Sequence, residues 1–117
     1  MLKELSEICG VSGQEDEVRE RIIKAIEGLV DDYRVDALGN LLAVKRSLGK
    51  GTLKVMIAAH MDEVGLMITH VEKDGFLRFM PVGGLDDRIL LAKRVVIGAN
   101  KVPGIIGLKP IHKLKEE

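Results

Sequence analysis

The apolar segment Leu53–Ala59 constrains the fold of this chain more than any other feature, because it leads directly into His60 and Asp62. Residues Val55–Ala59 carry no charge, and such a run is typical of a strand that is covered on both faces of a sheet. A strand of this kind places His60 at the carboxyl edge of an open α/β sheet, where these folds bind ligands. We therefore predict a buried central strand that ends at a functional histidine.

Asp62 follows His60 at a spacing that lets its carboxylate reach the second ring nitrogen. A carboxylate in that position fixes the tautomer and the orientation of a metal-bound histidine. Two alanines before His60 leave room at the strand end, and the acidic pair Asp62-Glu63 follows where a cation could sit. The spacing alone leaves an alternative equally open, a core histidine at a strand end with a solvated aspartate beside it.

The first third of the chain has helical periodicity. Leu2, Leu5 and Ile8 predict a short helix that stops at Gly10. The segment Ser12-Gly13-Gln14-Glu15 has the spacing of a capping box, and it predicts the start of an amphipathic helix that ends within residues 28–31. The apolar stripe of that helix consists of Val18, Ile22, Ile23, Ile26, Leu29 and Val30.

Strand patterns follow, and turn residues separate them. Asp74-Gly75 is a hairpin signal, and the change from helix plus strand to nearly all strands predicts a domain boundary within residues 63–85. Besides Leu53–Ala59, the predicted strands are Tyr33–Asp36, Leu41–Lys45, Gly65–Val71, Phe76–Val82, Arg94–Ala99 and Gly104–Leu108. Because no closing element follows the last strand, we expect a piece of a longer protein whose unpaired strand edges self-associate.

Composition excludes several classes of function. Eighteen basic and eighteen acidic side chains give zero net charge, so neither a nucleic acid nor an anionic membrane is an expected partner. No apolar run is long enough to span a bilayer. The absence of a signal-peptide profile and the single Cys9 favour the reducing cytoplasm. We expect Cys9 to behave as a small buried apolar residue.

The remaining polar residues do not complete a metal site. His70 is expected on the exposed face of a strand, the acidic group Asp86-Asp87 is expected to cap a turn and pair with Arg88, and a role for His112 stays open. A hydrolytic metal centre needs several ligands, an open position for water and a nearby carboxylate base. The residues therefore indicate half of a site.

Several motifs together resemble the glutamyl aminopeptidase family, which includes the tetrahedral (TET) aminopeptidases. Their order along the chain carries the resemblance, which covers nearly all of it. The motifs are Gly10-Val-Ser-Gly13-x-Glu15, Asp36-x-Leu-Gly39-Asn40-Leu, Ala59-His60-Met-Asp62-Glu63-Val-Gly65-Leu-Met, Val82-Gly83-Gly84 and Gly104-x-Ile-Gly107-x-Lys-Pro110-x-His112.

This resemblance implies the first part of a zinc-exopeptidase-like α/β catalytic domain, followed by the start of an inserted β-barrel dimerisation domain. Residues 1–66 and 67–117 would form these two parts. The resemblance also implies two divalent metal ions, zinc or cobalt, with His60 as a metal ligand and Asp62 as the catalytic-site residue that orients it. Assembly from dimers to dodecamers and a peptide substrate are further expectations of the same kind.

The leading interpretation is the amino-terminal portion of a cytoplasmic metalloaminopeptidase that is inactive as an isolated piece. An alternative is a non-catalytic β-rich assembly module. A third interpretation, a polysaccharide hydrolase, would need two positioned carboxylates and usually aromatic sugar platforms. The chain has three aromatic residues and no tryptophan, so the sequence does not favour it.

Overall fold

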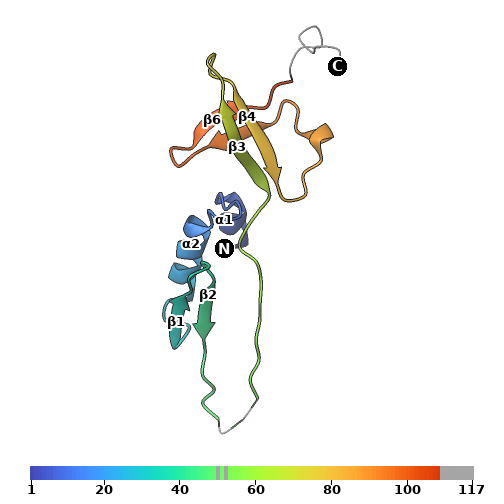
Figure 1. Ribbon diagram of the computed structural model, residues 1–117. Coiled ribbons are helices and arrows are strands. Elements are labelled where there is room, and N and C mark those ends of the chain that lie inside the picture. Colours follow the sequence, from blue (N-terminus) through green and yellow to red (C-terminus); the bar gives the residue numbers. More distant parts are fainter. Residues whose placement is uncertain (50, 52, 109–117) are drawn as a thin grey trace. The chain divides into compact units, whose positions relative to one another are not determined.

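Three antiparallel hairpins contain the strands of the computed structural model, which describes residues 1–49, 51 and 53–108 (Figure 1). The chain divides into two units, Met1–Gly83 and a second that begins at Gly84. The elements are α1 (Leu2–Glu7), α2 (Asp16–Ile26), β1 (Asp32–Val35), β2 (Leu41–Val44), β3 (Gly65–Val71), β4 (Leu77–Val82), η1 (Asp87–Ile89), β5 (Arg94–Ile97) and β6 (Val102–Ile105). Helices and strands are thus mixed, as predicted, and the proposed barrel stays a prediction.

Helix α1 confirms the predicted short helix, but α2 begins differently from the prediction. Glu15 occupies the N-cap without a capping side-chain bond, and its Oε1 accepts from the Gly13 amide at 2.7 Å instead. The predicted capping box is therefore wrong, because a turn at Gly13, with φ of +85°, separates Ser12 from the helix. Helix α2 ends at Ile26, shortly before Gly28 adopts a left-handed φ of +74°.

Charged side chains connect α2 to its neighbours in the first unit. Arg21 pairs with Glu4 of α1, and Arg19 donates to the carbonyl of Gly39 at 3.0 Å. These contacts hold α2 against α1 and against the turn that joins β1 to β2.

The hairpins confirm most of the predicted strands to within a few residues. β1 pairs with β2, β3 with β4 around Gly75, and β5 with β6. A register irregularity falls between Ile68 and His70 of β3. The last strand is displaced from its predicted position, since Gly104 lies inside β6 rather than at its start.

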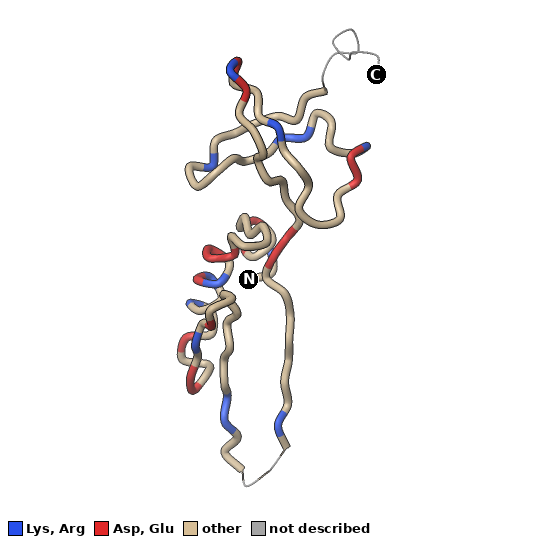
Figure 2. Tube along the Cα trace, viewed as in Figure 1, with Lys and Arg blue, Asp and Glu red and all other residues tan. Residues whose placement is uncertain are grey.

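The segment 53–59 contradicts the predicted buried central strand. It lies outside the assigned strands, and Ile57 is 93% exposed. The physical reason is that the strands on both sides of it in the sequence pair within their own hairpins, β1 with β2 and β3 with β4. No strand of the described part of the chain pairs with this segment. Figure 2 shows that charged residues are nearly absent along it.

Burial is sparse in both units. Among the residues that the structure describes, the buried apolar side chains are Val18 at 6% exposed and Ile106 at 8%. Cys9 is exposed, so the expectation of a buried cysteine was wrong. It follows Ile8, where α1 has already ended, which leaves its side chain unpacked. No helix in the described ranges has the length and apolar character to cross a membrane.

Candidate metal centre at His60

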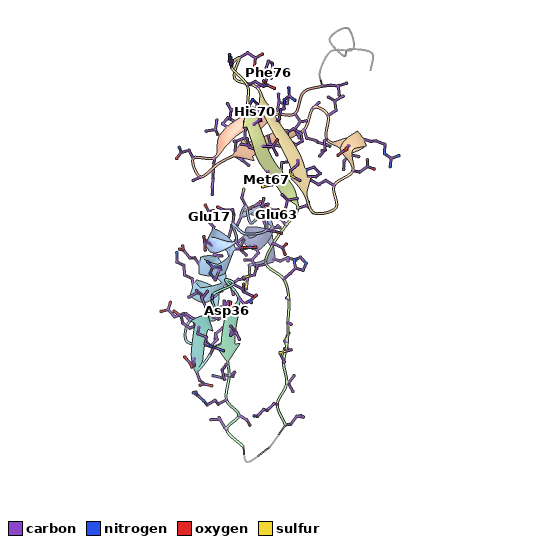
Figure 3. The ribbon with its side chains drawn as sticks, viewed as in Figure 1. Glu17, Asp36, Glu63, Met67, His70 and Phe76 are labelled. Carbon is purple, nitrogen blue, oxygen red and sulfur yellow. The ribbon has the colours of Figure 1, made fainter. Side chains whose placement is uncertain are left out.

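The loop after α1 pairs with the segment that follows His60. Val11 and Glu63 form a parallel bridge, and the Glu63 amide donates to the Gly10 carbonyl at 2.8 Å. The Gly10 amide donates in turn to Oε1 of Glu63 at 3.0 Å. Figure 3 labels Glu63 at this junction. These contacts anchor the chain immediately beyond His60 and Asp62.

Glycine is required where the loop meets α2. A Cβ at Gly10 would lie 2.6 Å from Cγ2 of Val18 and 3.5 Å from the carbonyl oxygen of Met61. A real Cβ does not approach another carbon so closely, so a side chain here would force the loop away from α2. The glycine thus lets the loop lie between the buried Val18 and the segment that carries the candidate site.

His60 has two acceptors at one ring nitrogen. Its Nδ1 lies 3.0 Å from the carbonyl oxygen of Asp62 and 3.2 Å from Oδ1 of the Asp62 carboxylate. A carbonyl oxygen can only accept, so we assign the proton of the neutral ring to Nδ1. The Nε2 lone pair is then available, on a side chain that is 85% exposed.

Asp62 is held from its other side by Ser12. The Ser12 hydroxyl donates to Oδ2 of Asp62 at 2.5 Å, the short distance expected of a hydrogen bond to a charged oxygen. This hydrogen bond is the main reason why the pKa of Asp62 lies below its ordinary value. Asp62 is therefore a carboxylate that faces His60 with one oxygen and Ser12 with the other.

Sequence reasoning had assigned Ser12 to the helix cap and missed this contact. The available signal was Gly13, which directly follows Ser12. A glycine that adopts positive φ marks a turn, and a turn at this place removes Ser12 from the start of α2.

The candidate site borders a hollow of about 370 Å³ in the first unit. It is lined by Glu15, Ile22 and residues 38–41 and 59–62. His60 and Asp62 thus lie where a small group can approach them from solvent.

The other candidates lie apart from this arrangement. His70 is exposed on β3, with Nε2 3.8 Å from Glu72. Asp86 caps η1 and binds Arg88, as predicted, and the guanidinium of Arg88 lowers the pKa of Asp86. His112 lies outside the described residues. Within residues 1–49, 51 and 53–108 no group of three His, Cys, Asp or Glu side chains could hold a metal ion.

Comparison with known proteins decides the family. The sequence model of the M42 glutamyl aminopeptidases matches residues 39–117, more than half of the chain. The chain belongs to the M42 glutamyl aminopeptidase family. A further family model, described as AMPT, matches residues 1–20.

Individual members and neighbours support this placement. The lysyl aminopeptidase of Pyrococcus furiosus is 35% identical over 119 residues, which cover 99% of this chain and 34% of that protein. The TET1 peptidase of Pyrococcus horikoshii, described as assembling into a tetrahedron or a large octahedral shell, is 43% identical with a TM-score of 0.79. The match covers 99% of this M42 chain and 34% of the TET1 chain.

A Thermotoga maritima protein named as an endoglucanase also has this fold. It is 49% identical with a TM-score of 0.85, and the match covers 94% of this chain and 34% of the other. The M42 chain thus spans about a third of the length of the relatives that it matches.

Proposed function

We propose that this chain forms the amino-terminal part of the catalytic domain of a metal-dependent aminopeptidase, with His60 as a metal ligand and Asp62 orienting it. The observation that carries the proposal is the contact of His60 Nδ1 with the backbone carbonyl oxygen of Asp62 and with Oδ1 of its carboxylate, which leaves the Nε2 lone pair to bind a metal ion. Membership of the M42 family supplies the reaction class, hydrolysis of amino-terminal residues from peptides.

The donor chemistry of His60 fits one position of a zinc or cobalt site, since imidazole nitrogen suits both ions. The described part of the chain supplies no group of three ligands, so the remaining ligands and the general base would come from other residues. Two divalent ions, when bound, would acidify a water that attacks the scissile carbonyl. The role of this chain is to present His60 in one tautomer and orientation.

The wider setting follows from the same family. We propose a cytoplasmic homo-oligomer, from dimer to dodecamer, in which residues from about 67 onward begin the dimerisation domain. The shells described for the TET1 peptidase support assembly.

Paramagnetic cobalt tests His60 directly. In an amide NMR titration of the 117-residue protein with Co²⁺, we expect the largest shifts to centre on residues 59–62. His60→Ala should abolish them, whereas His70→Ala, which removes an exposed histidine elsewhere, should not. Shifts that persist in His60→Ala would remove His60 from the proposed centre.

Activity gives an independent test. The isolated chain should hydrolyse no aminoacyl-anilide in excess zinc or cobalt, because no described group can complete the centre. Turnover that is lost on chelation, restored by metal and absent in His60→Ala would show that the chain holds a complete site.

A second candidate function is polysaccharide hydrolysis, because the Thermotoga neighbour is named as an endoglucanase. Such an enzyme needs two carboxylates about 5–9.5 Å apart at the scissile bond. The candidate site described above is built around a histidine instead. Release of reducing sugars from cellulose by the longer protein, unaffected by His60→Ala, would favour this second function.

A further inference from the structure

The two oxygens of the Asp62 carboxylate have different partners. Oδ1 faces His60 Nδ1 at 3.2 Å, and Oδ2 accepts from the Ser12 hydroxyl at 2.5 Å. A carboxylate on its own rotates broadly about its last torsion. The Ser12 hydrogen bond removes that freedom and fixes which oxygen is presented to the histidine.

Ser12 is itself held by the backbone on both sides. The amide of Gln14 donates to the carbonyl of Val11 at 2.7 Å, which closes a turn with Ser12 in its second position. Gly13 has φ of +85°, as the third position of a type II turn requires. Val11 is bridged to Glu63, so the turn and the Asp62 segment share one anchor.

We propose that Ser12 is a positioning residue of the metal centre, which acts through Asp62 to keep His60 protonated at Nδ1 with Nε2 directed to the ion. The inference rests on the proposed function for the identity of the ion. The tautomer of His60, in contrast, is a property of the metal-free chain. The chain of contacts runs from the turn hydroxyl to the carboxylate and from the carboxylate to the imidazole.

The histidine tautomer is the measurement that tests this role. Nitrogen-15 NMR of the imidazole, at a pH where the ring is neutral, gives the ratio of Nδ1–H to Nε2–H for His60, and the signal is assigned by its loss in His60→Ala. Removal of the Ser12 hydroxyl should lower this ratio by roughly two- to tenfold, the range of one ordinary hydrogen bond. The loss is partial because the Asp62 carbonyl still accepts from Nδ1.

The matched pair is Ser12→Thr and Ser12→Val, which share their shape and β-branching and differ in the hydroxyl. Ser12→Thr should keep the wild-type ratio, and Ser12→Val should lower it. Ser6→Ala is the remote control, because the Ser6 hydroxyl donates to the Lys3 carbonyl within the first helix. Any disturbance of the loop by β-branching affects both members of the pair, so their difference still reports on the hydroxyl.

Equal ratios in Ser12→Thr and Ser12→Val would overturn the role of Ser12, even with cobalt binding at His60 intact. If the wild-type chain binds no cobalt at His60, but the tautomer ratio still differs clearly between Ser12→Thr and Ser12→Val, the proposed function is overturned instead. The Ser12–Asp62–His60 contacts would then remain established. The two proposals therefore fail separately.

Discussion

Asp36 shows what one of the family-like motifs does physically. Its Oδ1 accepts from the amides of Leu38 and Asn40, each at 2.9 Å, and its Oδ2 accepts from the Asn40 side chain at 2.9 Å. Gly39 supplies a φ of +86° in the same turn. The motif Asp36-x-Leu-Gly39-Asn40 thus closes the β1–β2 hairpin, so turn chemistry gives a local structural explanation for these residues.

The ionisation of Asp36 gives a pH-dependent prediction. The Asn40 side chain is the main reason why the pKa of Asp36 is lowered. The ionised form is favoured in the fold, so this stabilisation is present above the ordinary pKa of about 3.9. It is lost as the pH falls through the lower folded value. Asn40→Ala should move the carboxyl carbon-13 titration of Asp36 up toward the ordinary value.

Asn100→Ala, which makes the same change in the second unit, is the control for this titration. An Asp36 midpoint that does not move in Asn40→Ala would mean that the backbone amides alone hold the carboxylate.

The site residues differ in how far the sequence can reveal them. Asp62 was found because it lies two residues from His60 in one extended segment, where local geometry fixes what it can reach. Ser12 is separated from Asp62 by 50 positions. Its contact depends on the loop pairing of Gly10 and Glu63, which no local pattern encodes.

At the scale of elements, the hairpins were predictable and the central strand was not. Turn residues such as Asp74 and Gly75 act within a few positions, so they determine a hairpin without help from the rest of the chain. A central strand is defined by its neighbours instead. The apolar segment 53–59 has strand composition, yet no strand of the described chain pairs with it.

Replacing an apolar side chain with alanine tests whether that side chain is buried. Because Ile57 is exposed, Ile57→Ala should change the free energy of unfolding of this chain by less than about 0.5 kcal/mol. Val18→Ala, which truncates the buried side chain next to Gly10, should lower the free energy of unfolding by roughly 1–3 kcal/mol. Denaturant unfolding measures both, and a larger loss for Ile57 than for Val18 would show that the segment is buried in solution.

At the scale of the whole molecule, apolar side chains are more often exposed than buried in the described residues. Leu53, Val55, Met56 and Ile57 are exposed in one continuous stretch, and Ile105 is exposed on β6. Each two-stranded hairpin also has unpaired edges. Surfaces and edges of this kind recruit other chains.

We therefore expect the isolated chain to self-associate as its concentration rises. Ile57→Lys and Ile105→Lys should each reduce the association measured by light scattering. Leu48→Lys, which adds the same charge at an exposed apolar residue outside these stretches, should change it little. A monodisperse monomer at high concentration, with slow amide exchange in β5 and β6, would contradict the expectation.

The pairing of Gly10 with Glu63 has a consequence for the order of folding. The β3–β4 hairpin closes across the short turn Glu72–Phe76, and hairpins form within about 1–10 μs. Closing a loop of some 50 residues costs about 2 kcal/mol more than closing one of five. We therefore expect the contact between Gly10 and Glu63 to form after the β3–β4 hairpin and to open before it. The lifetime of this contact, rather than that of the hairpin, would then limit how long His60 keeps the orientation proposed for metal binding.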